Sequence, residues 1–334
     1  MKNLIRLRFA LYSCLLINLP LHSQPGTTAL RQGIEWGVSH HYDRALALFD
    51  SLAVEYPLHP APPFYRAAIF QSMMLDYETN AWQDTFYRSI EASIRLAKLL
   101  LRRERQDVSG HFYAGAAYAY KSAQLARDGK YWHAYRAIQT SLDYLNPLLR
   151  QDSSYCDALL GIGTYQYWRS RFTKNLSWLP LFPDHRQQGI DKIIRVSRCA
   201  QLSQSSAWSN LTWIYIREHK FKESIHYARL GLEAFPQSRF FLWPLAEAQF
   251  LDHNYQEASA TYHLLLKSTR DAPVNNGYNE LVILWKLAQC AEKLGDLPEA
   301  QKKYQEVVHC RVDEEVIKRA ENKKNMARKW LEKL

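Results

Sequence analysis

Apolar and polar residues recur along this chain with the period of amphipathic helices. The stretch from Trp82 to Arg105 contains neither Gly nor Pro, and its apolar residues return every three or four positions. His111 to Arg127 repeats this pattern. Because residues at such spacing share one face of an α-helix, both stretches predict long helices with one buried face. The helical pattern therefore predicts an all-α protein.

Shorter helical segments share one order of residue types. Each runs from a turn residue through an aromatic residue or Leu to a small residue, with an aromatic residue or Ala about four positions later. The segments begin at His40, His219, His253 and Leu294, and their small residues are Ala45, Ser224, Ala258 and Ala300. Ser224 and Ala258 are 34 residues apart. An internal repeat of this length indicates stacked helical hairpins.

The repeated residues resemble the signature of the tetratricopeptide repeat (TPR) family. In the unit where the match is fullest, they are Trp208, Leu211, Thr212, Tyr215, Phe221, Ser224, Ala228, Gly231 and Pro236. Shorter sets in register include Gly33, Trp36, Tyr42 and Phe49 near the beginning, and Leu284, Ala288, Ala300 and Tyr304 near the end. The resemblance implies a right-handed superhelical solenoid of antiparallel helix hairpins.

Small residues in the first helix of each unit predict how many hairpins the chain forms. A small side chain there allows close approach of the second helix. The seven equivalent positions are Gly33, Ala67, Gly115, Gly163, Thr212, Ala246 and Ala288, which are successively 34, 48, 48, 49, 34 and 42 residues apart. We therefore expect about seven hairpins within residues 24–334, with long central units at about 61–205, regular units at about 206–312 and a capping helix at 313–334.

The fourth unit contains an insert, SWLPLFPDHRQQGI, from Ser177 to Ile190. Its first helix is expected to end near Arg171 and its second to begin near Asp184 or Arg186. A connection this long is either packed on its own neighbours or functional. Trp178 and Phe182 would contact a partner under the second interpretation. The region from Gly161 to Ile193 is also similar to TPR proteins of the eukaryotic inclusion-body-clearance type.

The first 23 residues have the composition of a signal peptide. Lys2, Arg6 and Arg8 precede an apolar run from Phe9 to Leu21. This run is shorter than the roughly 18 to 20 residues that cross a bilayer, so cleavage is favoured over anchoring. Lipidation of Cys14 is a minor alternative. We expect an exported protein that is periplasmic, associated with the cell envelope or secreted.

The charge distribution limits the classes of partner. The chain carries 43 Lys and Arg against 33 Asp and Glu, a net charge of +10. Loss of the signal peptide removes three basic residues and leaves +7. Seven Lys or Arg and two Glu lie between Lys318 and Leu334. This run predicts either a solvated terminal helix or peripheral contact with an acidic partner or anionic surface. It lacks the aromatic pattern of nucleic-acid-binding modules, so no nucleic acid is expected.

Four cysteines follow the signal peptide, and none forms a CxxC pair. A structural zinc site is therefore not expected. Cys156 begins the first helix of the fourth unit and Cys199 ends the second, so antiparallel packing favours a disulfide between them. Cys290 and Cys310 lie near opposite ends of another hairpin, and we expect both to be reduced and buried.

Aromatic residues occupy several positions that line the concave groove in TPR arrays. The resemblance places Trp168, Trp213, Trp243, Phe250 and Trp285 there, whereas Lys and Arg do not recur at these positions. Such residues could hold a peptide, stack on sugar rings or pack on one another. These five residues, together with Trp178 and Phe182 of the insert, are the candidate partner-binding residues.

Catalytic and cofactor motifs are not found in the sequence. It contains no HExxH, no glycine-rich phosphate loop and no GxSxG, and His40, His41, His219 and His253 fall in expected turns. We therefore expect a non-enzymatic scaffold, without metal or cofactor, that binds a protein or peptide. A glycan- or lipid-binding solenoid that uses the aromatic groove is the alternative, with a hydrolase in the central units third.

Overall fold

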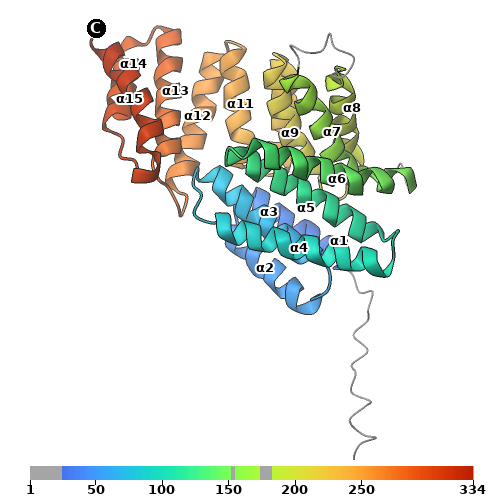
Figure 1. The fold of residues 1–334 in the computed structure, drawn as a ribbon. Helices are drawn as coiled ribbons and strands as arrows, with labels where there is room; N and C mark the ends of the chain where they lie inside the picture. The colour runs from blue at the N-terminus through green and yellow to red at the C-terminus, as the bar shows by residue number, and fades with distance from the viewer. Residues whose placement is uncertain (1–24, 152–154, 174–182, 334) are drawn as a thin grey trace, which may run out of the picture.

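The computed structural model describes residues 25–151, 155–173 and 183–333. Within these ranges the chain forms helices α1 to α15 and one 3-10 turn, η2, without strands. The predicted signal peptide, residues 1–23, and the insert residues Trp178 and Phe182 lie outside the described residues. The prediction of an all-α solenoid is confirmed by consecutive packing of each helix on the next (Figure 1).

Within the described residues the helices form seven hairpins, in agreement with the about seven expected from the spacing of small residues. Their paired helices are α1 (Thr27–Val38) and α2 (Tyr42–Glu55), α3 (Ala61–Asp76) and α4 (Gln83–Arg103), α5 (Val108–Arg127) and α6 (Tyr131–Gln151), α7 (Cys156–Phe172) and α8 (Arg186–Cys199), α9 (Gln204–Arg217) and α10 (Phe221–Ala234), α11 (Arg239–Leu251) and α12 (Tyr255–Arg270), and α13 (Tyr278–Leu294) and α14 (Leu297–His309). The capping helix, α15 (Ile317–Leu331), follows η2 (Glu314–Val316).

The small residues lie where paired helices approach most closely. All seven predicted positions are buried. In two hairpins a serine of the second helix reaches the backbone of the first: Ser141 Oγ donates to the carbonyl of Gly115 at 2.7 Å, and Ser224 Oγ to that of Thr212 at 3.0 Å. A larger side chain at either place would separate the helices and break these bonds.

Three of the turns inside hairpins place a histidine in the left-handed region. The φ angles of His40, His219 and His253 are 63°, 56° and 64°. Gly129 and Gly295 occupy the same place in two other turns, with φ of 74° and 80°. The next residue donates its N–H back into the preceding helix, as Lys220 does to the Tyr215 carbonyl at 2.9 Å. This bond satisfies a carbonyl that the helix end would leave unpaired.

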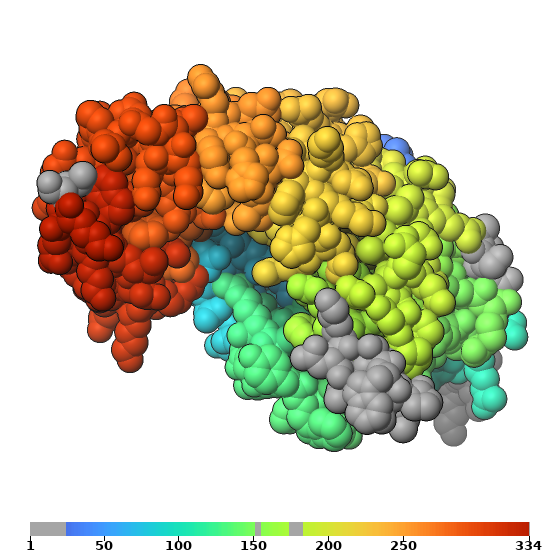
Figure 2. All heavy atoms as spheres, turned by 90° about the horizontal axis from the view of Figure 1, so that it is seen from above, coloured from blue at the N-terminus to red at the C-terminus, as the bar shows by residue number. Residues whose placement is uncertain are grey.

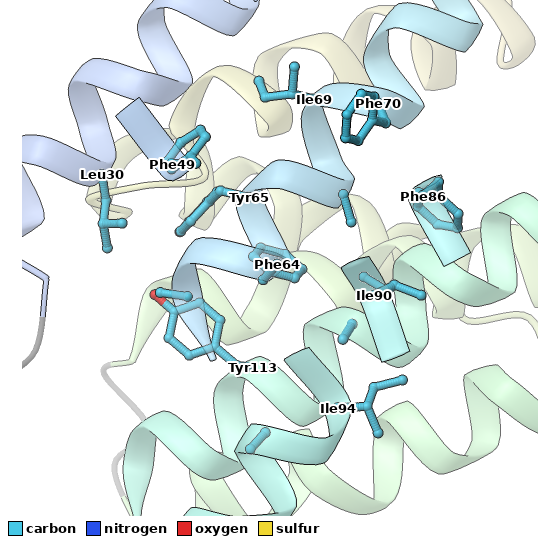
Figure 3. Close-up of a cluster of buried hydrophobic side chains, with 14 of the residues drawn as sticks. Leu30, Phe49, Phe64, Tyr65, Ile69, Phe70, Phe86, Ile90, Ile94 and Tyr113 are labelled. Carbon is cyan, nitrogen blue, oxygen red and sulfur yellow. The ribbon is translucent and has the colours of Figure 1, made fainter. Parts of the chain in front are cut away.

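Buried side chains form separate clusters along the chain. Figure 3 shows the N-terminal cluster, in which Phe49 stacks on Tyr65 with 5.3 Å between ring centroids and Phe64 contacts Tyr113 edge to face. A second cluster joins α7 to α9, and a third joins α11 to α15. Each unit buries its apolar face against its neighbours, which is the packing that defines a solenoid.

The two ends of the solenoid also contact each other. The α1–α2 turn lies against the start of α11, where Ser238 Oγ donates to the Val38 carbonyl at 2.8 Å. The C-terminal end of α3 lies against α13, since Asn279 Nδ2 donates to the Asp76 carbonyl at 2.7 Å. Figure 1 shows the N-terminal helices below the ends of α11 to α13. The chain therefore closes into a single compact turn.

Candidate partner-binding site

A hollow lies inside the curve of the solenoid. Figure 2 shows it between the C-terminal units and the central helices, with N-terminal helices at its floor. The candidate residues come from the first helices of successive units, α7, α9, α11 and α13. α9 packs on α7 and on α11, so these helices follow one another around the curve.

Trp213 on α9 is the most exposed of the candidate residues that the structure describes. Its side chain is 39% exposed, whereas the neighbouring Thr212 and Ile214 are buried. The indole is therefore carried on a rigid, well-packed helix while part of its surface remains accessible. Such a ring can be buried by a partner at a small cost in conformational entropy.

Trp168, Trp243 and Phe250 are half-buried. Trp168 stacks on Phe172 of the same helix with centroids 5.8 Å apart, and Trp243 packs against the C-terminal core. Phe250 meets Tyr255 edge to face at 5.4 Å. Each of these rings combines a supporting contact with an accessible part.

The structure buries Trp285, which was predicted to line the groove. Its side chain is only 8% exposed and meets Tyr304 at 5.3 Å, while Tyr304 in turn contacts Trp330 at 4.4 Å. Because α14 and α15 cover this ring, Trp285 belongs to the C-terminal core. The ring is therefore not open to a partner in this structure.

A charged cluster lies beside Phe250 and was missed from the sequence. Glu247 accepts from Lys286 Nζ at 2.7 Å and from the Tyr262 hydroxyl at 3.0 Å. The Lys286 ammonium lies 4.7 Å from the centroid of Phe250. On α15, burial lowers the pKa of Lys323, the Lys286 charge lowers it further and Glu247 opposes the shift. Lys286 directly follows a predicted groove position, whereas only the packing of α15 brings Lys323 near it.

The end of the insert that the structure describes is fixed to the solenoid. Arg186 forms ion pairs with Asp184 at 2.8 Å and with Glu218 at 3.1 Å. Glu218 also accepts from the Tyr167 hydroxyl at 2.9 Å. These bonds join the start of α8 to α7 and the end of α9. They do not test the two interpretations of Trp178 and Phe182.

The basic C-terminal helix uses part of its charge internally. Arg319 pairs with Glu78 of the N-terminal units at 2.6 Å, and Arg328 pairs with Glu321 at 2.7 Å. Lys324 donates to the Cys310 carbonyl at 2.6 Å. Within the described residues, Lys318 and Lys329 are exposed and form no ion pair. The helix thus presents a weaker positive surface than its sequence suggests.

The cysteines of the fourth unit form a disulfide in the structure. Cys156 and Cys199 are joined with their Cα atoms 6.0 Å apart. Cys290 is a buried thiol whose pKa burial raises to about 12. Cys310 is also a free thiol, but it is half-buried rather than buried as expected. It follows the last residue of α14, where the chain leaves the hairpin and packing is incomplete.

Neither metal nor membrane-spanning features occur among the described residues. No group of three His, Cys, Asp or Glu in these parts of the chain could hold a metal ion. The helices that were placed include none with both the length and the hydropathy to cross a bilayer. The turn residues His40, His219 and His253 have left-handed backbone angles, and the residue after each of them donates its N–H to the preceding helix.

Comparison with known proteins gives structural similarity alone. No protein-family model matches the sequence, and no curated protein matches it. Among solved structures, the pilus biogenesis factor PilW is 11% identical with a TM-score of 0.47, covering 72% of this chain and 91% of PilW. YrrB, described as a TPR protein with an unusual peptide-binding site, is 10% identical with a TM-score of 0.45, covering 68% and 97%. TTC0263, a TPR protein of Thermus thermophilus, is 17% identical with a TM-score of 0.42, covering 67% and 98%. The TPR-like character of this chain rests on its own repeats and hairpins.

Proposed function

We propose that this protein is a non-catalytic scaffold that binds a protein or peptide partner in its hollow. The observation that carries the proposal is the exposed Trp213 on a rigid inner helix. Trp168 and Trp243, on the helices before and after it, present further half-buried rings. Aromatic anchors of this kind dominate the energy of protein interfaces.

The charges beside Phe250 suggest the chemistry of the partner. Glu247 balances one positive charge, whereas Lys286 and Lys323 together supply two. A segment with an apolar or aromatic side chain for Trp213 and an acidic group for the lysines fits this arrangement. Because Lys286 and Lys323 are partly removed from water, an acidic group there gains more than at an open surface.

Export belongs to the same proposal. Its support is the composition of residues 1–23 together with the Cys156–Cys199 bond, since stable disulfides form mainly in oxidising compartments. We propose a periplasmic, envelope-associated or secreted location. Fractionation of cells that express the full chain, with N-terminal sequencing of the product, tests this. A cytoplasmic product that retains Met1 to Ser23 would contradict it.

Peptide display on the mature chain tests the binding function. We expect enriched peptides to combine an aromatic or apolar residue with an acidic one, and to bind at least about tenfold more weakly to Trp213→Ala or Lys286→Gln. The matched control is Leu264→Ala, which removes an exposed apolar side chain from α12 without touching the inner helices. Enriched peptides that bind all three variants equally would place the site elsewhere.

The glycan-binding alternative makes a different prediction in the same variants. Trp213 could stack on a sugar ring, so a glycan array on the mature chain would give hits lost in Trp213→Ala but retained in Lys286→Gln for neutral sugars. Peptide hits without glycan hits favour the scaffold. Contact of Lys318 and Lys329 with an anionic surface remains a separate, peripheral part of the proposal.

A further inference from the structure

Three aromatic side chains protrude together at the start of α6. Tyr131, Trp132 and Tyr135 are 74%, 67% and 51% exposed. They are among the most exposed aromatic side chains of the described chain, and they follow one another within about one turn of a helix. Isolated exposed apolar residues are normal, whereas a contiguous group marks an interaction surface.

The fold explains why these rings face outward. The buried face of α6 consists of small residues and leucines, namely Ala134, Ala137, Ser141, Leu145 and Leu148. Tyr131, Trp132 and Tyr135 lie outside this buried face. Residues three or four positions apart lie side by side on a helix. Trp132 and Tyr135 accordingly stack with centroids 5.7 Å apart and ring planes 23° apart. The packing of α5 on α6 does not require any of the three.

Positive charge surrounds the rings. Lys130 and Arg136 are both exposed, and neither forms an ion pair with any residue that the structure describes. The nearest acidic residue in sequence, Asp128, already accepts from the Tyr87 hydroxyl at 2.8 Å and from Gln124 at 2.9 Å. The surface formed by residues 130–136 is therefore both aromatic and basic.

An aromatic and basic surface could bind a sugar, a protein or a lipid bilayer, and its details favour the bilayer. A sugar platform needs outward ring faces, but Trp132 and Tyr135 cover one face of each other. The centre of a protein interface is depleted of lysine, whereas Lys130 flanks these rings. Tyrosine and tryptophan accumulate at the boundary between lipid headgroups and hydrocarbon, and lysine and arginine attract anionic lipid.

We propose that residues 130–136 dock the protein onto an anionic bilayer surface. Tyr131 and Trp132 would enter the headgroup region while Lys130 and Arg136 contact the phosphates. The surface contains none of the candidate partner-binding residues, so it can be tested independently of peptide binding. It is also distinct from α15, and the two basic surfaces can be tested against each other.

Co-sedimentation of the mature protein with vesicles tests the proposal. We expect binding to vesicles of phosphatidylcholine with phosphatidylglycerol, at least about tenfold weaker binding to phosphatidylcholine alone, and loss of binding in high salt. Trp132→Ala/Tyr135→Ala and Lys130→Glu/Arg136→Glu should each reduce binding at least about tenfold. Circular dichroism and thermal melting establish that both variants remain folded.

Two controls make the outcome specific. Val54→Ser/Leu264→Ser removes apolar side chains that are 84% and 60% exposed elsewhere, and it should bind vesicles as the wild type does. Lys318→Glu/Lys329→Glu reduces the charge of α15 and should have a smaller effect than the α6 variants. Vesicle binding lost through α15 alone, or wild-type binding by Trp132→Ala/Tyr135→Ala, overturns the proposal. It is equally overturned if the α6 variants only change the oligomeric state.

Discussion

Arg239 and Asp76 lie 163 residues apart in the chain and form a buried ion pair. Arg239 Nε donates to Asp76 Oδ1 at 2.7 Å, and Nη2 donates to Oδ2, so the contact is bidentate. Their side chains are only 6% and 1% exposed. The pair joins α3 to α11 and is the centre of the contact that closes the solenoid.

Removal of Arg239 should therefore destabilise the whole fold. In Arg239→Ala, the Asp76 carboxylate stays buried and keeps only the hydrogen bonds from Tyr42 and His40. Leaving one partner of a buried pair uncompensated costs about 3 to 5 kcal/mol. Urea unfolding of the mature chain measures this loss.

An exposed pair provides the control for this measurement. Arg270 and Glu280 form an ion pair with side chains 50% and 21% exposed. Arg270→Ala should cost less than about 1 kcal/mol because water screens the charges. Equal losses in the two variants would mean that the Arg239–Asp76 contact does not hold the ends together.

Buried histidines predict that the protein loses stability in mild acid. Burial lowers the pKa of His40 despite the opposing effect of Asp76, and burial lowers the pKa of His59 to about 4. The Arg239 backbone N–H donates to His40 Nε2 at 2.7 Å, which requires that nitrogen to be unprotonated. Tyr42, Asp76, Arg239 and His41 are the titratable or charged groups around His40.

The direction of this pH dependence follows from the number of protons that the folded and unfolded chains bind. Between the lowered pKa values and the ordinary value of about 6.5, the unfolded chain binds more protons than the folded one. The free energy of unfolding should thus be highest above about pH 6.5 and fall as the pH drops toward 4, with His59 alone contributing a loss of about 3 kcal/mol. Burial by itself raises the pKa of Asp76, but bonds from Arg239 and His40 hold it well below its usual value, so its contribution persists to lower pH.

Urea titrations between about pH 4 and pH 7.5 check this prediction. His59→Asn retains an acceptor for the Ala61 N–H, which His59 Nδ1 now accepts at 3.2 Å. This variant should show a shallower dependence on pH than the wild type. A stability that stays constant from about pH 7 to pH 4.5 in the wild type would contradict the assignment of neutral buried histidines.

The sequence predicted local features well because they depend on nearby residues. The hairpins follow from small residues such as Gly115 and Thr212, whose spacing is visible without a structure. The ion pair between Arg239 and Asp76 could not be predicted, because the sequence around either residue gives no indication of its partner. The burial of Trp285 was missed for a related reason: Tyr304 of α14 lies against its ring, and Trp330 of α15 lies against Tyr304.

Aromatic residues on α6 illustrate the opposite case. Tyr131, Trp132 and Tyr135 lie off the stripe formed by Ala134, Ala137 and Ser141, so their exposure could have been predicted from the helical period. They were not predicted as binding residues because the groove positions lie in the first helix of each hairpin, whereas α6 is a second helix.

Histidines in the left-handed turns give two variants with opposite expected effects. His219 has φ of 56° and is exposed, so His219→Gly should relieve backbone strain and raise the free energy of unfolding by about 0.5 to 1 kcal/mol. His40→Gly would relieve similar strain but remove the acceptor for the Arg239 N–H and the ring stacked on Phe240 at 5.2 Å. We expect a net loss of about 1 kcal/mol or more for His40→Gly. Thermal melting separates the two, and a loss in both would argue against strain at His219.

The disulfide should stabilise the fourth unit. Cys156 and Cys199 are 43 residues apart, and closing a loop of this length stabilises a fold by about 4 kcal/mol in the chain-entropy model. Cys156→Ser/Cys199→Ser should lower the urea midpoint, whereas Cys310→Ser should have little effect because that half-buried thiol is free. Alkylation of Cys156 in the unreduced protein, followed by mass spectrometry, would contradict the bond.

Gly163 of α7 and Gly189 of α8 lie against each other where the two helices pack. A Cβ on Gly163 would lie 2.8 Å from the Gly189 carbonyl oxygen, and a Cβ on Gly189 would lie 2.6 Å from that of Gly163. Backbone atoms cannot move aside as a side-chain end can. Gly163→Ala should therefore force the helices apart and cost about 3 kcal/mol, at the upper end of overpacking effects.

Gly161 offers a matched control two residues away on the same helix. A Cβ there meets only Leu145 Cδ1, at 2.9 Å, which a small side-chain rotation relieves. Since alanine also favours helix more than glycine does, Gly161→Ala should be neutral or stabilise by up to about 1 kcal/mol. Urea unfolding measures the stability of both variants. If Gly163→Ala is as stable as Gly161→Ala, close approach of α7 and α8 does not determine the packing of the fourth unit.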